Sequence, residues 1–273
     1  MANKFNEIGM RGKILDTSVL SFYDNLAPNY HLIFKDFKKA VLLENRALNK
    51  VIRKYHPSRE RLSLLDCSCG IGTQVLGLAR YNYQIHATDL SPKAVKEVRK
   101  RAKHFGASLT FGVADFRKLS RQVKGQFDVV ITCDNALPHL LTEGDILSGL
   151  RNIRSKLKPG GLCLVGIRDY DPILKVRPTS PRIPALHKSS LGERIYFQVW
   201  DWKKGSNIYK VNLFLLRQSK GEWKTQCHKT YYRAISRAEL TGLLKKAGFS
   251  GIRWLMPKET GYIQPLAMAF NNK

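Results

Sequence analysis

The sequence lacks three features, and each absence excludes a class of protein. No apolar run reaches the roughly 18 residues that span a bilayer, so no membrane-crossing helix is expected. The first residues, MANKFNEIGMRGK, contain no apolar stretch of the kind found in signal peptides. The five cysteines are an odd number, and their spacing fits neither a disulfide framework nor a zinc site. We therefore expect a cytoplasmic protein with reduced cysteines, no metal and no membrane partner.

Acidic residues are also scarce, since 21 Asp and Glu stand against 47 Lys and Arg, for a net charge of +26. Such a surface attracts polyanions without specificity. The basic residues are spread along the chain, and the densest stretch, 95–105, has the spacing of a solvated helix face. The charge therefore leaves two interpretations open: a nucleic-acid partner, or a surface that keeps the protein soluble. With 43% hydrophobic residues, a packed core is expected in either case.

Between residues 60 and 170, short apolar runs alternate with helical patterns. Ser91 and Thr142 stand where N-caps are expected, and Ser236 begins a further helix near the end of the chain. This alternation predicts right-handed βαβ units and a doubly wound, mainly parallel sheet of seven strands. The expected strands cover 62–67, 84–89, 109–113, 127–133, 162–167, 252–256 and 265–270, and the expected helices within the α/β region cover 72–80, 92–106 and 142–158.

The segments on either side of this pattern differ from it. Residues 1–58 look helical, with the clearest helix over 37–55. Residues 171–189 are rich in proline and are interpreted as a loop, whereas 194–235 alternate apolar and polar positions in three runs, as an antiparallel meander does. We expect three parts: a helical cap (1–58), an α/β domain (59–170 and 236–273), and an inserted loop with an antiparallel β-lid (171–235).

Polar and glycine residues follow the first four expected strands, at the edge where open α/β sheets bind ligands. A glycine-rich turn at 66–72 allows close approach of the backbone to a ligand. Asp89 ends the second strand, where a carboxylate can accept hydrogen bonds from both hydroxyls of a ribose. Asp115 and Phe116 follow the third strand and can bracket an adenine ring. Residues 133–135 end the fourth strand beside the expected reaction centre.

The segments DCSCGIG, TDLSP, VADF, CDNALPHLL and LKPGG resemble, in order and spacing, the motifs of class I S-adenosylmethionine (SAM)-dependent methyltransferases. Within that superfamily the chain is most similar to the glycine/sarcosine N-methyltransferase group, through FYDNLAPNYHLIF, CDNALPHLL and IRDYDPIL. The resemblance implies a Rossmann-like domain, SAM as cofactor and S-adenosyl-L-homocysteine as its product.

From the motifs and the resemblance together we predict which residues form the site. Asn135 and Arg168 are expected to face the substrate, and His139 is either a base or a packed imidazole beside the cofactor. The predicted cofactor residues are Tyr23, Tyr30, Asp66, Ser68, Gly70, Gly72, Asp89, Leu90, Asp115, Phe116, Cys133, Asp134 and His139. The group often carries Arg-Gln where this chain has Leu43-Glu44, so we expect a basic contact to the cofactor carboxylate to be missing.

The predicted function is methyl transfer from SAM to a small molecule, to the amine of a carboxylate-bearing acceptor such as glycine or sarcosine. Arg168 is expected to bind that carboxylate, or else to pair with Asp169 or Asp171. Two alternatives remain: a methyltransferase for RNA or another nucleic acid, which the charge favours, and a SAM-binding protein without catalysis. The absence of an Asn-Pro-Pro-Tyr motif after the fourth strand counts against the first. Cys133 is interpreted as a small apolar residue rather than a nucleophile, and the inserted meander as a lid carrying Tyr196, Trp200 and Tyr232.

Overall fold

The computed structural model describes residues 13–56, 61–181, 183–189, 192–219 and 221–272. The first twelve residues and the expected domain boundary at 58/59 lie outside the described residues. Among the described helices, none combines the length and the apolar character needed to cross a bilayer.

Seven strands form the central sheet in the order β10-β11-β5-β4-β1-β2-β3. All neighbouring strands pair in parallel except β11, which is antiparallel to both β5 and β10. The predicted doubly wound, mainly parallel sheet is therefore confirmed. The strands are β1 (Leu62–Asp66), β2 (Tyr83–Asp89), β3 (Thr110–Val113), β4 (Phe127–Thr132), β5 (Leu157–Gly166), β10 (Ser250–Leu255) and β11 (Leu266–Asn271).

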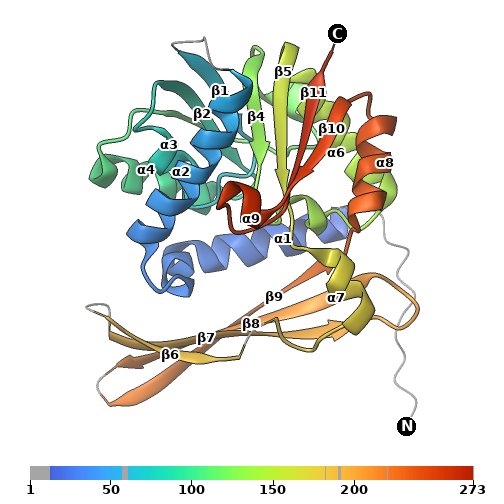
Figure 1. Ribbon diagram of the computed structural model, residues 1–273. Coiled ribbons are helices and arrows are strands. Elements are labelled where there is room, and N and C mark those ends of the chain that lie inside the picture. Colours follow the sequence, from blue (N-terminus) through green and yellow to red (C-terminus); the bar gives the residue numbers. More distant parts are fainter. Residues whose placement is uncertain (1–12, 57–60, 182, 190–191, 220, 273) are drawn as a thin grey trace.

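Alternate residues of the central strands pack into two different cores, one on each face of the sheet. In β4, Val129 and Ile131 belong to one core and Val130 to the other, as the period of two in a strand requires. The helices α2 (Phe37–Tyr55), α3 (Val75–Leu78) and α4 (Pro92–Phe105) cover the first face. The helices α6 (Glu143–Ser155) and α8 (Arg237–Lys246) cover the second, with the short α5 (Leu119–Gln122) beside α6 (Figure 1).

Side-chain caps fix where the longer helices begin. Ser91 Oγ accepts a hydrogen bond from Ala94 N at 3.0 Å, and Pro92 stands at the first helical position of α4. Thr142 and Ser236 cap α6 and α8 in the same way. These three N-caps were all predicted from the sequence.

A second sheet, of four antiparallel strands in the order β6-β7-β8-β9, lies below the carboxyl edge of the central sheet (Figure 1). The helix α1 (Lys13–Leu26) and the 3-10 helix η1 (Ala27–Ile33) lie between the two sheets. The strands of the second sheet are β6 (Ala185–Ser189), β7 (Gly192–Trp202), β8 (Ile208–Ser219) and β9 (Glu222–Arg233).

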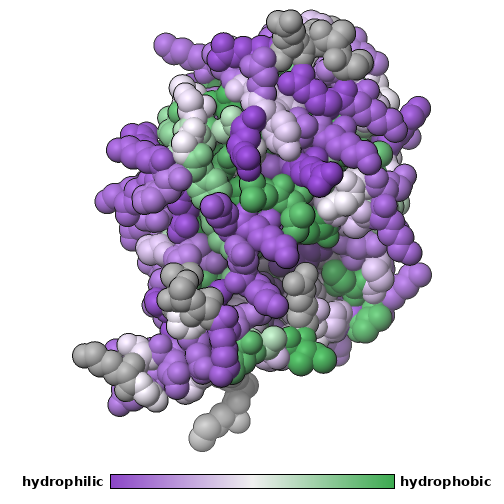
Figure 2. Space-filling model, turned by 60° about the vertical axis from the view of Figure 1, so that its left-hand side comes forward, coloured by the Kyte–Doolittle hydropathy of each residue, from purple (hydrophilic) through white to green (hydrophobic). Residues whose placement is uncertain are grey.

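Hydrophilic side chains cover most of the face drawn in Figure 2, and an apolar band crosses its middle.

Three local predictions were wrong. The expected loop at 171–189 contains α7 (Tyr170–Val176), anchored by the buried Tyr170, and β6, an edge strand that pairs with β7. The helix expected to reach residue 158 ends at Ser155, because Leu157 already pairs with Phe127 and the following Pro-Gly-Gly forms an irregular part of β5. The helix expected over 72–80 is reduced to α3. The shorter elements η2 (Leu137–His139) and α9 (Pro257–Thr260) were not expected.

Gly72 provides a test of the turn after β1. Its φ is +98°, and an added Cβ would lie 2.6 Å from Val98 Cγ2 and 2.8 Å from Leu76 Cγ. Gly106, with φ +62°, has no heavy atom within 4 Å of the added Cβ. We expect Gly106→Ala to lower the free energy of unfolding by about 1 kcal/mol through backbone strain alone. Gly72→Ala should lower it by about 2–4 kcal/mol, because overlap in the core is added to the strain. Urea unfolding followed by circular dichroism measures both, and equal losses would contradict the packing argument.

Candidate functional site

A pocket lies at the carboxyl ends of β1 to β4, and residues of α1 and η1 contribute to its wall. The structure brings nearly all of the predicted cofactor residues to its wall. Those that line it are Tyr23, Tyr30, Ser68, Gly70, Asp89, Leu90, Asp115, Phe116, Cys133, Asp134 and His139. Asp66 and Gly72 lie behind the wall, where they shape the turn rather than face the pocket.

The turn after β1 is held to the end of β2 by one carboxylate. Asp89 Oδ2 accepts a hydrogen bond from Gly70 N at 2.8 Å, and its Oδ1 accepts one from Ser91 N at 2.9 Å. Burial raises the pKa of Asp89, while these backbone donors oppose the rise. Gly70 has φ +51°, and a Cβ at this position would lie 3.8 Å from the Tyr30 ring. Because Gly70 has no side chain, the pocket stays wider between this backbone and the Tyr30 ring.

Asp66 is buried at the base of this turn. Its Oδ1 accepts a hydrogen bond from Ser68 N at 3.0 Å, and its Oδ2 has no hydrogen-bond partner among the described residues. Burial raises the pKa of Asp66 to about 8. The side chain is therefore mostly protonated at neutral pH in the absence of ligand.

The backbone after β4 takes an unusual path. Asp134 and Asn135 have φ of +54° and +67°, in the left-handed region that Asp and Asn tolerate better than other non-glycine residues. Asn135 N donates to Gly166 O at 3.0 Å, and Asn135 Oδ1 accepts from Arg168 N at 3.1 Å. Asn135 is buried and does not line the pocket. It joins the ends of β4 and β5, and so fixes both Asp134 in the wall and the backbone of Arg168.

The guanidinium of Arg168 lies among aromatic rings of the inserted sheet. It is 5.2 Å from the ring centroid of Trp200 and 5.1 Å from that of Tyr232, and its Nη1 donates to Tyr209 Oη at 3.1 Å. Among the described residues, no carboxylate lies within ion-pair distance of it. The two acids that could have paired with it face Arg237 instead, with Asp171 Oδ2 at 2.6 Å and Asp169 Oδ1 at 3.9 Å from Arg237 Nε.

His139 links the N-terminal helix to the inserted sheet. Its Nδ1 lies 3.2 Å from the carbonyl oxygen of Tyr231, which can only accept, so Nδ1 carries the proton. Its Nε2 then accepts from Tyr23 Oη at 2.8 Å, and the ring lies 4.1 Å from that of Tyr232. Burial lowers the pKa of His139 to about 3. The imidazole is therefore neutral and a weak base, well placed to orient the Tyr23 hydroxyl.

Cys133 has the surroundings of an inert thiol. Burial raises its pKa well above the ordinary value, so almost no thiolate is present at neutral pH. This agrees with the interpretation of Cys133 as a small apolar residue of the pocket wall.

Several pocket residues were missed from the sequence. Arg117 and Asp145 line the wall beside Asp115, and Gln74 lines it beneath α2. Arg117 stands two residues after Asp115, and Asp145 lies in the first turn of α6, after the N-cap Thr142. Glu44 accepts from Gln74 Nε2 at 3.1 Å, whereas its neighbour Leu43 is 56% exposed. Of the pair Leu43-Glu44, which was expected to lack a basic contact to the cofactor, the leucine is therefore exposed and the glutamate is turned toward Gln74.

Comparisons with known proteins agree with this geometry. Residues 64–161 match the family described as "Methyltransferase domain". The chain thus contains a segment that is similar to a methyltransferase domain. A SAM-dependent methyltransferase from Clostridium acetobutylicum superposes with a TM-score of 0.70 at 13% identity, over 93% of this chain and 98% of that one. A SAM-bound amino pentose methyltransferase from Micromonospora echinaspora, involved in calicheamicin biosynthesis, superposes with a TM-score of 0.67 at 17% identity, over 84% and 91%. The predicted class I SAM-dependent methyltransferase fold is confirmed.

Curated relatives are similar over a shorter stretch. A glycine/sarcosine N-methyltransferase from Parasynechococcus marenigrum is 30% identical over 122 residues, which are 45% of this chain and 42% of that protein. A ubiquinone biosynthesis O-methyltransferase from Caulobacter vibrioides is 33% identical over 106 residues, 39% and 40% of the two chains. The match spans less than half the length of these relatives.

The raised pKa of Asp66 predicts a pH dependence of stability. The folded carboxyl, with a pKa of about 8, keeps a proton that the unfolded chain loses near pH 4. Because the folded state binds more protons across this window, its stability falls as pH rises from about 4 to 8. As pH rises from 5 to 8, we expect the free energy of unfolding to fall less in Asp66→Asn than in the wild type. Urea titrations without cofactor measure this difference. The exposed Asp201→Asn serves as control, and parallel profiles for Asp66→Asn and wild type would refute the assignment.

Proposed function

We propose that this protein is a SAM-dependent methyltransferase that acts on the amine of a small, carboxylate-bearing acceptor. The adenosyl part of the cofactor would lie against Asp89, Leu90 and Phe116, and its methionine part would lie against Gly70 and Tyr30. When bound, SAM supplies an electrophilic methyl group on a sulfonium. The residues of the chain then contribute alignment and exclusion of water.

The observation that carries the acceptor proposal is the environment of Arg168. A partly buried cation such as Arg168, which has no carboxylate partner among the described residues, is costly unless a ligand completes its hydrogen bonds. Aromatic faces hold the guanidinium in one orientation and leave N–H groups for a carboxylate, which Arg can bind with two parallel bonds. Burial raises the pKa values of Asp134 and Tyr30, which line the pocket, and both groups lie close enough to Arg168 for its charge to oppose that rise. An acceptor held by Arg168 would therefore reach toward the cofactor.

The reaction at this site needs no covalent intermediate. A neutral amine attacks the methyl carbon in line with the bond to sulfur, and its proton is lost to water or a nearby base. The Tyr23 hydroxyl, oriented by His139, lies between the pocket and Tyr232 and can accept a hydrogen bond from the amine. The inserted sheet closes this end from water, since Tyr232 and Trp200 project from its inner face.

Asp89 tests the cofactor part of the proposal. Asp89→Asn keeps the shape of the side chain but replaces one acceptor oxygen with a donor. We expect the affinity for S-adenosylhomocysteine in calorimetric titration to fall about tenfold or more, because a ribose hydroxyl and a backbone N–H lose their acceptor. NAD should not bind to the wild type. Unchanged affinity in Asp89→Asn would contradict the assignment of this carboxylate to the ribose.

Arg168 tests the acceptor part. Arg168→Lys keeps the charge but not the planar fork, so turnover of glycine and sarcosine should fall about a hundredfold or more while the affinity for S-adenosylhomocysteine is retained. Arg177→Lys is the matched control, because Arg177 also lies over an aromatic ring, that of Trp202 at 5.5 Å, but is exposed to solvent. Methyl transfer from labelled SAM measures both variants. If the wild type methylates no amino acid, or if Arg168→Lys remains as active, the acceptor proposal fails and the cofactor proposal stands.

A further inference from the structure

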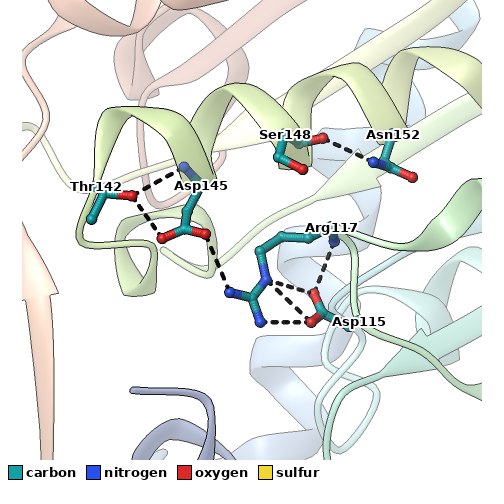
Figure 3. A network of polar contacts seen from close by, with 6 residues as sticks. All are labelled: Asp115, Arg117, Thr142, Asp145, Ser148 and Asn152. Carbon is teal, nitrogen blue, oxygen red and sulfur yellow. Dashed lines mark hydrogen bonds and ion pairs between the residues drawn. The ribbon is translucent and has the colours of Figure 1, made fainter. Parts of the chain in front are cut away.

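Arg117 lies between two carboxylates at one end of the pocket (Figure 3). Its Nη2 donates to Asp115 Oδ2 at 2.7 Å, and its Nε lies 3.1 Å from both oxygens of the same carboxylate. Its Nη1 donates to Asp145 Oδ1 at 3.5 Å. All three side chains line the pocket, beside the ring of Phe116. The guanidinium thus joins the segment after β3 to the first turn of α6.

This group of charges is held rigidly. The side chains of Arg117 and Asp115 are only 11% and 12% exposed, and the fork of the guanidinium fixes the plane of the carboxylate. Arg117 N also donates to Asp115 Oδ1 at 2.9 Å. On the other side, Asp145 Oδ2 accepts from Thr142 Oγ1 at 2.7 Å, and Asp145 N donates back to the same hydroxyl. Neither carboxylate can turn without breaking bonds to its neighbours.

The arrangement favours a ligand edge that donates hydrogen bonds. Two carboxylates surround one guanidinium, so the group carries a net negative charge and has more acceptor sites than donors. The 6-amino group of adenine donates, and would be attracted. The 6-oxo group of hypoxanthine, which occupies the same place on the ring, only accepts and would be repelled by the carboxylates.

We propose that Arg117 is a positioning residue that makes this end of the pocket specific for the amino group of adenine, by fixing Asp115 and Asp145 on either side of it. This inference rests on the proposed function, because it takes an adenosyl cofactor as the ligand. Arg117 acts through the two acids and does not itself contact the reacting atoms.

The test compares S-adenosylhomocysteine with S-inosylhomocysteine, which differs only in carrying hypoxanthine. The wild type should bind the adenosyl ligand about tenfold or more tightly than the inosyl ligand in calorimetric titration. In Arg117→Gln the affinity for S-adenosylhomocysteine should fall about tenfold, while that for S-inosylhomocysteine changes less than about threefold, so the ratio approaches one. Arg121→Gln, on the exposed side of α5, is the control and should keep the wild-type ratio.

A residue that only stabilises the fold would affect both ligands equally. An equal loss for both in Arg117→Gln, or no loss for either, therefore overturns the inference. If Arg117→Gln does not fold, Asp145→Asn keeps the Arg117–Asp115 pair and should still lower the ratio severalfold, and an unchanged ratio in that variant overturns the inference as well. A wild type that binds both ligands equally refutes the role of Arg117 alone. A wild type that binds neither refutes the proposed function with it.

Discussion

The carboxyl edge of the central sheet depends on the Asp89 carboxylate. It accepts from Gly70 N and from Ser91 N, and so holds together the turn after β1 and the start of α4. Both N–H groups would otherwise be buried without an acceptor. Ser91 in turn donates to Asp24 Oδ1 at 2.5 Å, which fixes α1 over the same edge. One side chain therefore determines where the backbone lies open to a ligand and where the N-terminal helix closes above it.

The charge of the pocket differs from that of the surface. The chain as a whole carries +26, yet acids gather around the pocket: Asp66, Glu44 and Asp134 have pKa values raised by burial to about 8, 8 and 6. Among the residues that the structure describes, none of the three forms an ion pair, and only at Asp134 does a nearby cation, Arg168, oppose the effect of burial. A cationic ligand that entered would favour their charged forms, so binding and proton release are linked at this site. Such acids would favour the positive charge of the proposed sulfonium cofactor.

Local chemistry explains which parts of the fold could be predicted from the sequence. Ser91, Thr142 and Ser236 are caps whose side chains bond within their own turn, so sequence alone locates them. The strand β6 could not be found, because its pairing with β7 is a tertiary contact and the prolines around it suggested a loop. The early end of α6 depends on the pairing of Leu157 with Phe127, thirty residues away. Arg117 was missed for the same reason, since its second partner, Asp145, comes from a different βα unit.

The two ends of the proposed site are built by different parts of the chain, and this limits what the motifs reveal. Asp89, Gly70 and Phe116 follow strands of the central sheet, within the segment that matches the methyltransferase domain. Arg168 follows β5, beyond that segment, and its orientation depends on Trp200, Tyr209 and Tyr232 from three strands of the inserted sheet. Such aromatic contacts require that the strands pair in one register, which no single motif encodes. Residues of the central sheet therefore form the proposed cofactor end of the site, whereas residues of the inserted sheet hold the proposed acceptor end.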